Sequence, residues 1–281
     1  MTKKAVLTTG LLTVLIAISA FLFYNVKADG KLDKKNYVQS TTPTLFFHGY
    51  GSSANAEQHM TNAAKKAGVT KTVIRANVDR NGAVTLRGDI PKGAINPIVE
   101  VNYEDNRNPI DVGNYAKAVV SKLQEKYGFT KMNMVGHSLG NMSILYYLLE
   151  HAQDENLPQL QKQVNIANFA AGLEAMGLSS DVKVDKTTGQ PNQITQTFQR
   201  LLPLREVFPQ NQIDVLNIYG DYKNGSDGSV LNASSRSLKY LVADNAKSYQ
   251  EKKITGKLAQ HSQLHENSEV DKLLIQFLWG K

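Results

Sequence analysis

With 281 residues, 41% of them hydrophobic and 20% charged, the chain has the size and composition of one large globular domain rather than two small ones. The absence of cysteine excludes disulfides, thiolate metal sites and lipidation at cysteine. The formal net charge of +7 is scattered, without a basic block interleaved with aromatic residues, which argues against a nucleic-acid partner and favours a protein near an anionic envelope.

The N-terminus carries the first distinct segment. Lys3 and Lys4 precede an uncharged apolar run over residues 5–24, long enough to cross a bilayer as a helix. The Val26-Lys27-Ala28 stretch resembles a signal-peptidase site, but the run is longer than a usual signal core, which favours an uncleaved anchor. We therefore expect a signal peptide or membrane anchor over residues 1–28, a polar linker over 29–42, and a folded domain over 43–281.

The first half of that domain alternates strand and helix patterns. A short β run over 44–47 leads into a His-Gly loop and a helical segment over 54–67, and two strand-like runs flank the turn signal Asn81-Gly82. Another strand is expected over 95–103, and an amphipathic helix over 111–127 with Gly128 as its C-terminal cap. This order predicts an α/β fold with a mostly parallel sheet and helices on both faces.

Residues 131–154 contain the most informative pattern. A short apolar strand ends in Gly136-His137-Ser138-Leu139-Gly140, and a helical period follows at once. A sharp strand-to-helix turn needs small flanking residues, which Gly136 and Gly140 supply, and it leaves Ser138 at the tip. The arrangement resembles the nucleophile elbow of the α/β-hydrolases.

The second half continues the alternation around a long insertion. We expect strands over 164–169, 213–219 and 249–254, a helix over 236–243, and a closing helix from Val270. The insertion over about 170–212 is apolar and interrupted by Pro203. It predicts either a lid-like hydrophobic cover for an acyl chain or helices that pack into their own core.

A serine nucleophile needs a histidine base and a carboxylate that orients it, and in the α/β-hydrolase fold these follow the serine in the order acid, then histidine. Only His261 and His265 come late enough, and spacing alone does not separate them. Two carboxylates, Asp221 and Asp227, follow the strand over 213–219 and both remain candidates for the acid.

From residue 43 onward the chain resembles uncharacterised α/β-hydrolases of Gram-positive bacteria described as membrane-bound cell-surface hydrolases. The shared stretches are HGYG, GHSLG, SDGSV and LHEN. The resemblance implies His265 as the base, Asp227 as the acid, and an oxyanion hole from the backbone N–H groups of Tyr50 and Leu139. It also implies supporting roles for the other elbow and loop residues, which are His48, Gly49, Gly136, His137 and Gly140.

These features predict an extracytoplasmic serine hydrolase that cleaves small or lipid-like carboxylic esters through an acyl-enzyme. An acyltransferase with the same residues and a non-catalytic surface binding module are the alternatives. We expect no cofactor, no metal site and no nucleic-acid partner, with the membrane contacted through the N-terminal segment. The pattern defines neither acyl chain length nor oligomeric state.

Overall fold

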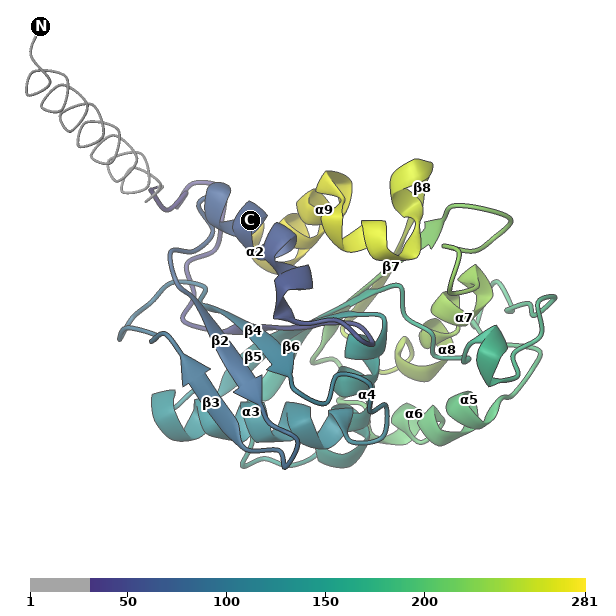
Figure 1. Cartoon of the computed structure of the whole chain (residues 1–281), viewed down its shortest axis with the longest axis horizontal. Helices are drawn as coiled ribbons and strands as arrows, with labels where there is room; N and C mark the ends of the chain where they lie inside the picture. The colour runs from purple at the N-terminus through teal and green to yellow at the C-terminus, as the bar shows by residue number, and fades with distance from the viewer. Residues whose placement is uncertain (1–30) are drawn as a thin grey trace, which may run out of the picture.

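The computed structural model describes residues 31–281, so the predicted anchor or signal segment lies outside the described residues. Its centre is an eight-stranded sheet in the order β3-β2-β4-β1-β5-β6-β7-β8, in which every neighbouring pair is parallel except β2 and β3 (Figure 1). The α/β-hydrolase fold class is therefore confirmed. The strands are β1 (Thr44–Phe47), β2 (Val73–Val78), β3 (Val84–Arg87), β4 (Ile98–Tyr103), β5 (Lys131–His137), β6 (Gln159–Ile166), β7 (Asp214–Asp221) and β8 (Ser248–Thr255).

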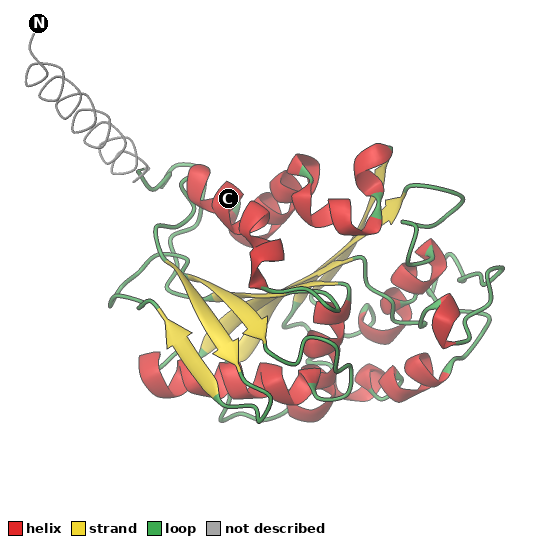
Figure 2. Cartoon of the chain, viewed as in Figure 1, coloured by secondary structure: helices red, strands yellow, loops and turns green. Residues whose placement is uncertain are grey.

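Helices cover both faces of this sheet (Figure 2). On one face lie α2 (Gln58–Lys66) and α9 (Ser268–Trp279), and on the other lie α3 (Val112–Tyr127) and α4 (Leu139–His151). The remaining helices are short: α5 (Gln196–Leu201), α6 (Leu204–Val207), α7 (Asn232–Arg236), α8 (Leu238–Val242), and the 3₁₀ helices η1 (Ala54–Glu57), η2 (Glu174–Met176), η3 (Lys257–Ala259) and η4 (His261–Glu266). Within residues 31–281, no helix is both long and apolar enough to span a membrane.

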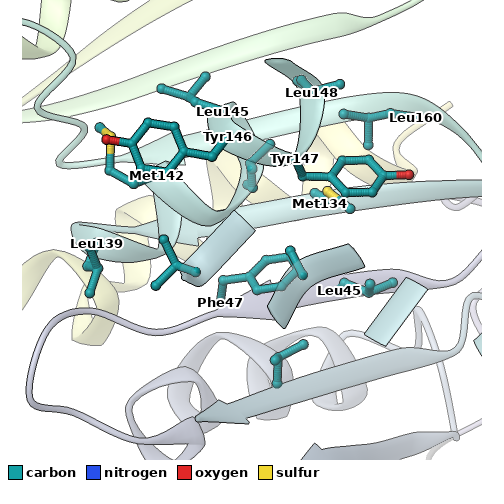
Figure 3. Close-up of a cluster of buried hydrophobic side chains, with 14 of the residues drawn as sticks. Leu45, Phe47, Met134, Leu139, Met142, Leu145, Tyr146, Tyr147, Leu148 and Leu160 are labelled. Atoms are coloured by element: carbon teal, nitrogen blue, oxygen red, sulfur yellow. The ribbon is translucent and has the colours of Figure 1, made fainter. Parts of the chain in front are cut away.

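Two apolar clusters lie above and below the sheet because successive side chains of a strand point to opposite faces. In β1, Leu45 and Phe47 belong to the cluster under α3 and α4, whereas Phe46 belongs to the cluster under α2 and α9. Figure 3 shows Leu45 and Phe47 in one buried cluster with the α4 side chains Met142 and Leu145. Burial on both faces explains why β1 has a continuous apolar run, Leu45-Phe46-Phe47, rather than an alternating pattern.

Residues 31–42, the described part of the predicted polar linker over 29–42, pack against the domain instead of extending away from it. Tyr37 forms an isolated bridge with Gly280, and the Val38 N–H donates to the Trp279 carbonyl at 2.8 Å. The buried Asn96 amide donates to the Val38 carbonyl at 2.7 Å. The segment has no hydrophobic period because backbone groups and one buried amide, rather than an apolar stripe, hold it in place.

The insertion between β6 and β7 packs its apolar side chains inward. Phe198, Leu201 and Leu204 are fully buried in the same cluster as α4, as expected for helices that pack into their own core. Met176 and Ile194 remain exposed on the same insertion. Movement of this segment as a lid stays a prediction.

One buried acid stands out beside this framework. Glu57, the last residue of η1, has no exposed surface, and neither carboxylate oxygen has a hydrogen-bond partner among the described residues. Burial, with the nearby Glu100 and Glu266 carboxylates, raises the pKa of Glu57 well above its usual range. The folded state therefore favours the neutral acid, whereas the unfolded chain ionises it freely.

This burial predicts that Glu57→Gln stabilises the protein as pH rises. A raised folded-state pKa means that stability is lost as pH climbs above the unfolded value, since only the unfolded chain releases the proton readily. We expect the variant to gain about 1 kcal/mol or more in unfolding free energy at pH 8, and clearly less at pH 5. Urea unfolding at both pH values measures this. The exposed Glu155→Gln is the control, and an equal effect of the two variants contradicts the prediction.

Candidate active site

The turn between β5 and α4 has the tight geometry that the glycine spacing predicted. Ser138 lies between the strand and the helix with φ 53° and ψ −119°, a strained conformation for a residue with a side chain. A Cβ on Gly140 would lie 2.0 Å from the Phe47 carbonyl oxygen, and one on Gly136 would lie 2.7 Å from backbone atoms of Gly140. Only glycine fits at either position, so β1, β5 and α4 close together behind Ser138.

Ser138 meets a histidine and an aspartate from two distant loops. The His261 Nε2 lies 2.9 Å from the Ser138 Oγ, and its Nδ1 lies 2.8 Å from the Asp227 Oδ2. The Asp227 side chain is 2% exposed and that of His261 14% exposed. With Asp227 ionised, Nδ1–H donates to the carboxylate and Nε2 is left to accept the serine proton.

Asp227 is itself held in a fixed orientation. Its Oδ1 accepts hydrogen bonds from the backbone N–H groups of Ser229 at 2.8 Å and Val230 at 2.7 Å, which leaves Oδ2 for His261. The backbone N–H of His261 also donates to the backbone carbonyl of Asp227 at 2.9 Å. The loop after β7 and the start of η4 therefore form one unit behind the imidazole.

The assignment of His265 to the serine is corrected by this geometry, which places His261 there. His265 packs edge-on against His137, with ring centroids 4.7 Å apart, and its Nδ1 lies 3.2 Å from Glu266 Oε1. Burial lowers the pKa of His265. Both histidines belong to η4, and in a 3₁₀ helix positions four apart point about 120° away from each other.

Of the two candidate acids, the structure brings only Asp227 to the imidazole. The Asp221 Oδ2 instead lies 3.2 Å from the Lys253 ammonium, and its Oδ1 accepts the Gly225 N–H at 3.2 Å. Asp221 is thus a partly exposed residue that closes the turn after β7.

The loop after β1 lies directly against the elbow. A Cβ on Gly49 would lie 3.2 Å from both the His137 Nδ1 and the Ser138 Cβ. The neighbouring Tyr50 N–H, like that of Leu139 at the start of α4, has no acceptor among the described residues. Both donors are therefore free to bind an oxygen beside Ser138.

His48 braces this loop from behind. Its Nδ1 lies 2.9 Å from the Gly49 carbonyl, and its Nε2 lies 3.1 Å from the Tyr103 backbone nitrogen. The neutral ring with its proton on Nδ1 satisfies both contacts, and burial lowers the pKa of His48, which favours that form. His48 therefore supports the loop and does not contact the Ser138 hydroxyl.

Comparison with known proteins agrees with this architecture. Residues 31–281 match the protein family described as "Alpha/beta hydrolase of unknown function (DUF915)". The chain belongs to this family. A comparison with curated proteins finds no match.

Among solved structures, this α/β-hydrolase is similar to the product of the gene lin2722 of Listeria innocua, with 25% identity and a TM-score of 0.75, over 85% of this chain and 94% of the other. It is also similar to a protein of Lactobacillus plantarum WCFS1 named for an inferred role as a cell surface hydrolase, with 21% identity and a TM-score of 0.68, over 84% of this chain and 91% of the other. Both likenesses extend over nearly the whole described fold.

His137 has a contact in this α/β-hydrolase that the sequence did not indicate. Its Nε2 lies 3.0 Å from the His261 carbonyl oxygen, and the ring packs between His261 and His265. Burial, together with these two neighbours, holds the pKa of His137 well below its usual range, so the ring stays neutral and keeps its donor. The pattern marked His137 only as an elbow residue, because nothing in the sequence pairs it with a carbonyl 124 positions later.

This contact predicts a positioning role for His137. His137→Leu removes the donor that fixes the His261 main chain, and we expect kcat to fall about tenfold with KM nearly unchanged. Because the ring stays neutral, the loss is expected to be the same factor from pH 6 to pH 9. His137→Gln, which keeps an N–H donor, is expected to recover part of kcat. Steady-state kinetics on a chromogenic ester measure this, and equal losses in both variants contradict it.

Proposed function

We propose that the protein is a serine hydrolase that cleaves carboxylic esters through an acyl-enzyme on Ser138. The observation that carries this proposal is the unbroken array from the Ser138 Oγ through His261 to Asp227, with contacts of 2.9 and 2.8 Å, at a strained strand-to-helix turn. A serine hydroxyl is a weak nucleophile, and this is the arrangement that activates one.

The reaction follows from the positions of these groups. The Ser138 Oγ attacks the ester carbonyl while the His261 Nε2 takes its proton, and Asp227 stabilises the imidazolium that forms. The N–H groups of Tyr50 and Leu139 bind the oxyanion, each contributing about 3 kcal/mol to the transition state. His261 then protonates the leaving alcohol, and a water activated by the same imidazole hydrolyses the acyl-enzyme.

The substrate class and location are part of the same proposal. The predicted anchor or signal segment supports a location of the domain outside the cytoplasm. The similar Lactobacillus plantarum protein is named for a role at the cell surface, which supports this location. Esters are the proposed substrates because a Ser-His-Asp array with two free N–H donors suits acyl transfer, and the proposed mechanism requires no cofactor.

Turnover of p-nitrophenyl esters of graded chain length by the full-length chain tests the proposal. We expect hydrolysis that Ser138→Ala abolishes. Ser262→Ala, which changes an exposed serine next to His261, is the matched control and is expected to retain activity. Turnover unchanged by Ser138→Ala, or no turnover of any ester together with no labelling by a fluorophosphonate, contradicts it and favours a binding module.

A further inference from the structure

Lysines gather where the described chain begins, beside the loop that precedes β2 and the end of α9. Residues 31–36 run beside the turn at Gly68, where the Asp33 N–H donates to the Gly68 carbonyl at 2.9 Å. Lys281, the last residue, donates its ammonium to the Lys34 carbonyl at 2.7 Å. Figure 1 shows the C-terminus beside α2, whose last turn holds Lys65 and Lys66. The lysine surface comprises the lysines close to these contacts together with Lys71, which follows the Gly68 turn by three residues; its members are Lys31, Lys34, Lys35, Lys65, Lys66, Lys71 and Lys281.

The charge of this surface is left almost unneutralised. All seven lysines are exposed, and none forms an ion pair within residues 31–281. The one acidic side chain among them, Asp33, is half-buried and accepts hydrogen bonds from the backbone N–H groups of Lys35 and Asn36. Lysines at the end of α2 also suit the helix dipole, but the other five have no such local reason.

The predicted membrane segment ends close to this surface. The apolar run over residues 5–24 stops seven positions before Lys31, and seven extended residues span at most about 25 Å. Since residues 31–42 pack against the domain, little free chain remains to turn the molecule over. The lysines must therefore stay near the headgroups of any bilayer that holds residues 5–24.

We propose that the lysine surface docks on an anionic bilayer beside the N-terminal segment. Clustered lysines next to a membrane anchor are attracted to anionic headgroups within about a Debye length, roughly 10 Å at 0.1 M salt. The docking surface lies at the end of the sheet where the parallel strands begin. Ser138 follows the carboxyl end of β5, a seven-residue strand about 20 Å long, so docking holds the nucleophile away from the bilayer. Its substrates would then come from outside that membrane.

The full-length chain tests this proposal, and because it contains no cysteine, single labelling sites can be introduced cleanly. A donor dye on Asn62→Cys reports the lysine surface, and the same dye on Ser180→Cys reports the segment after β6; both positions are exposed. The chain is reconstituted into vesicles of phosphatidylcholine, or phosphatidylcholine with phosphatidylglycerol, that carry a headgroup acceptor dye. We expect phosphatidylglycerol to increase energy transfer from position 62 and not from position 180. Most of that increase is expected to be lost at about 1 M salt, where the Debye length falls to about 3 Å.

Charge reversal identifies the residues responsible. Replacing Lys34, Lys35, Lys65 and Lys66 with Glu is expected to abolish the phosphatidylglycerol-dependent increase. The matched control reverses four exposed lysines that follow the carboxyl ends of the strands, and it is expected to keep the lipid-dependent increase in energy transfer. These are Lys183, Lys186, Lys223 and Lys257. Equal effects of the two quartets, or no lipid dependence at position 62, overturn the proposal. If the protein instead binds an immobilised polyanion through these lysines, while energy transfer to the vesicles does not depend on phosphatidylglycerol, the proposal is overturned in favour of an anionic polymer as the partner. The readout is independent of ester hydrolysis, so its failure and that of the proposed function are distinguishable.

Discussion

Replacing His261 with alanine is expected to lower kcat by about 10⁵-fold or more, because the imidazole serves both half-reactions and no other base within residues 31–281 contacts the serine hydroxyl. His265→Ala is the matched control. It removes the same side chain four positions later in the same helix, from a ring that contacts His137 and Glu266 instead of the nucleophile. We expect it to lower kcat by less than about tenfold.

Steady-state hydrolysis of one p-nitrophenyl ester by the wild type and both variants measures the difference. Far-ultraviolet circular dichroism and urea unfolding show whether each variant keeps its fold. A folded His265→Ala enzyme that loses as much activity as His261→Ala contradicts the assignment of the base. Retained activity in folded His261→Ala contradicts the proposed mechanism itself.

Replacing Asp227 with asparagine is expected to lower kcat by about 10⁴-fold through the tautomer of His261. The N–H groups of Ser229 and Val230 select an acceptor at the Oδ1 position, so the new amide group would point its NH₂ at the His261 Nδ1. That nitrogen must then accept a hydrogen bond, which places the ring proton on Nε2. A protonated Nε2 cannot take the proton of the serine.

Asp221→Asn is the control for this change. Asp221 contacts Lys253 and the Gly225 N–H at the end of β7, away from the imidazole, and we expect less than a threefold effect on kcat. Kinetics of the two variants on the same ester, with ¹⁵N NMR of the histidine ring nitrogens, separate a tautomer change from loss of structure. Equal losses, or an unchanged tautomer in Asp227→Asn, contradict the account.

The sheet and the elbow could be predicted because their signals are local. The apolar run over 44–47 is buried on both faces, as a central parallel strand requires, and Gly128 ends α3 with φ 69°. The spacing of Gly136, Ser138 and Gly140 reflects contacts between neighbouring backbones, so it could be interpreted without the rest of the fold. β6 begins at Gln159, whereas the expected strand began at 164. The sequence did not indicate the earlier start because Gln159, Gln161 and Lys162 are polar and at least partly exposed.

The base and the first packed residues could not be predicted in the same way, because both depend on contacts between distant segments. His261 and His265 occupy the same short loop, and only the turn of η4 decides which ring faces Ser138. Residues 31–42 are held by backbone hydrogen bonds to the end of α9 and by the Asn96 amide, and such contacts leave no hydrophobic period. The His137 contact with the His261 carbonyl is likewise invisible in the pattern.

The most direct test of the central claim, that His261 and Asp227 make one serine reactive, is mass spectrometry of the full-length chain after fluorophosphonate treatment. We expect a single adduct per chain, located on Ser138 within the tryptic peptide 132–162, and its rate of formation to fall sharply in His261→Ala but not in His265→Ala. An adduct on another serine, or labelling of Ser138 at the same rate in His261→Ala, would contradict it.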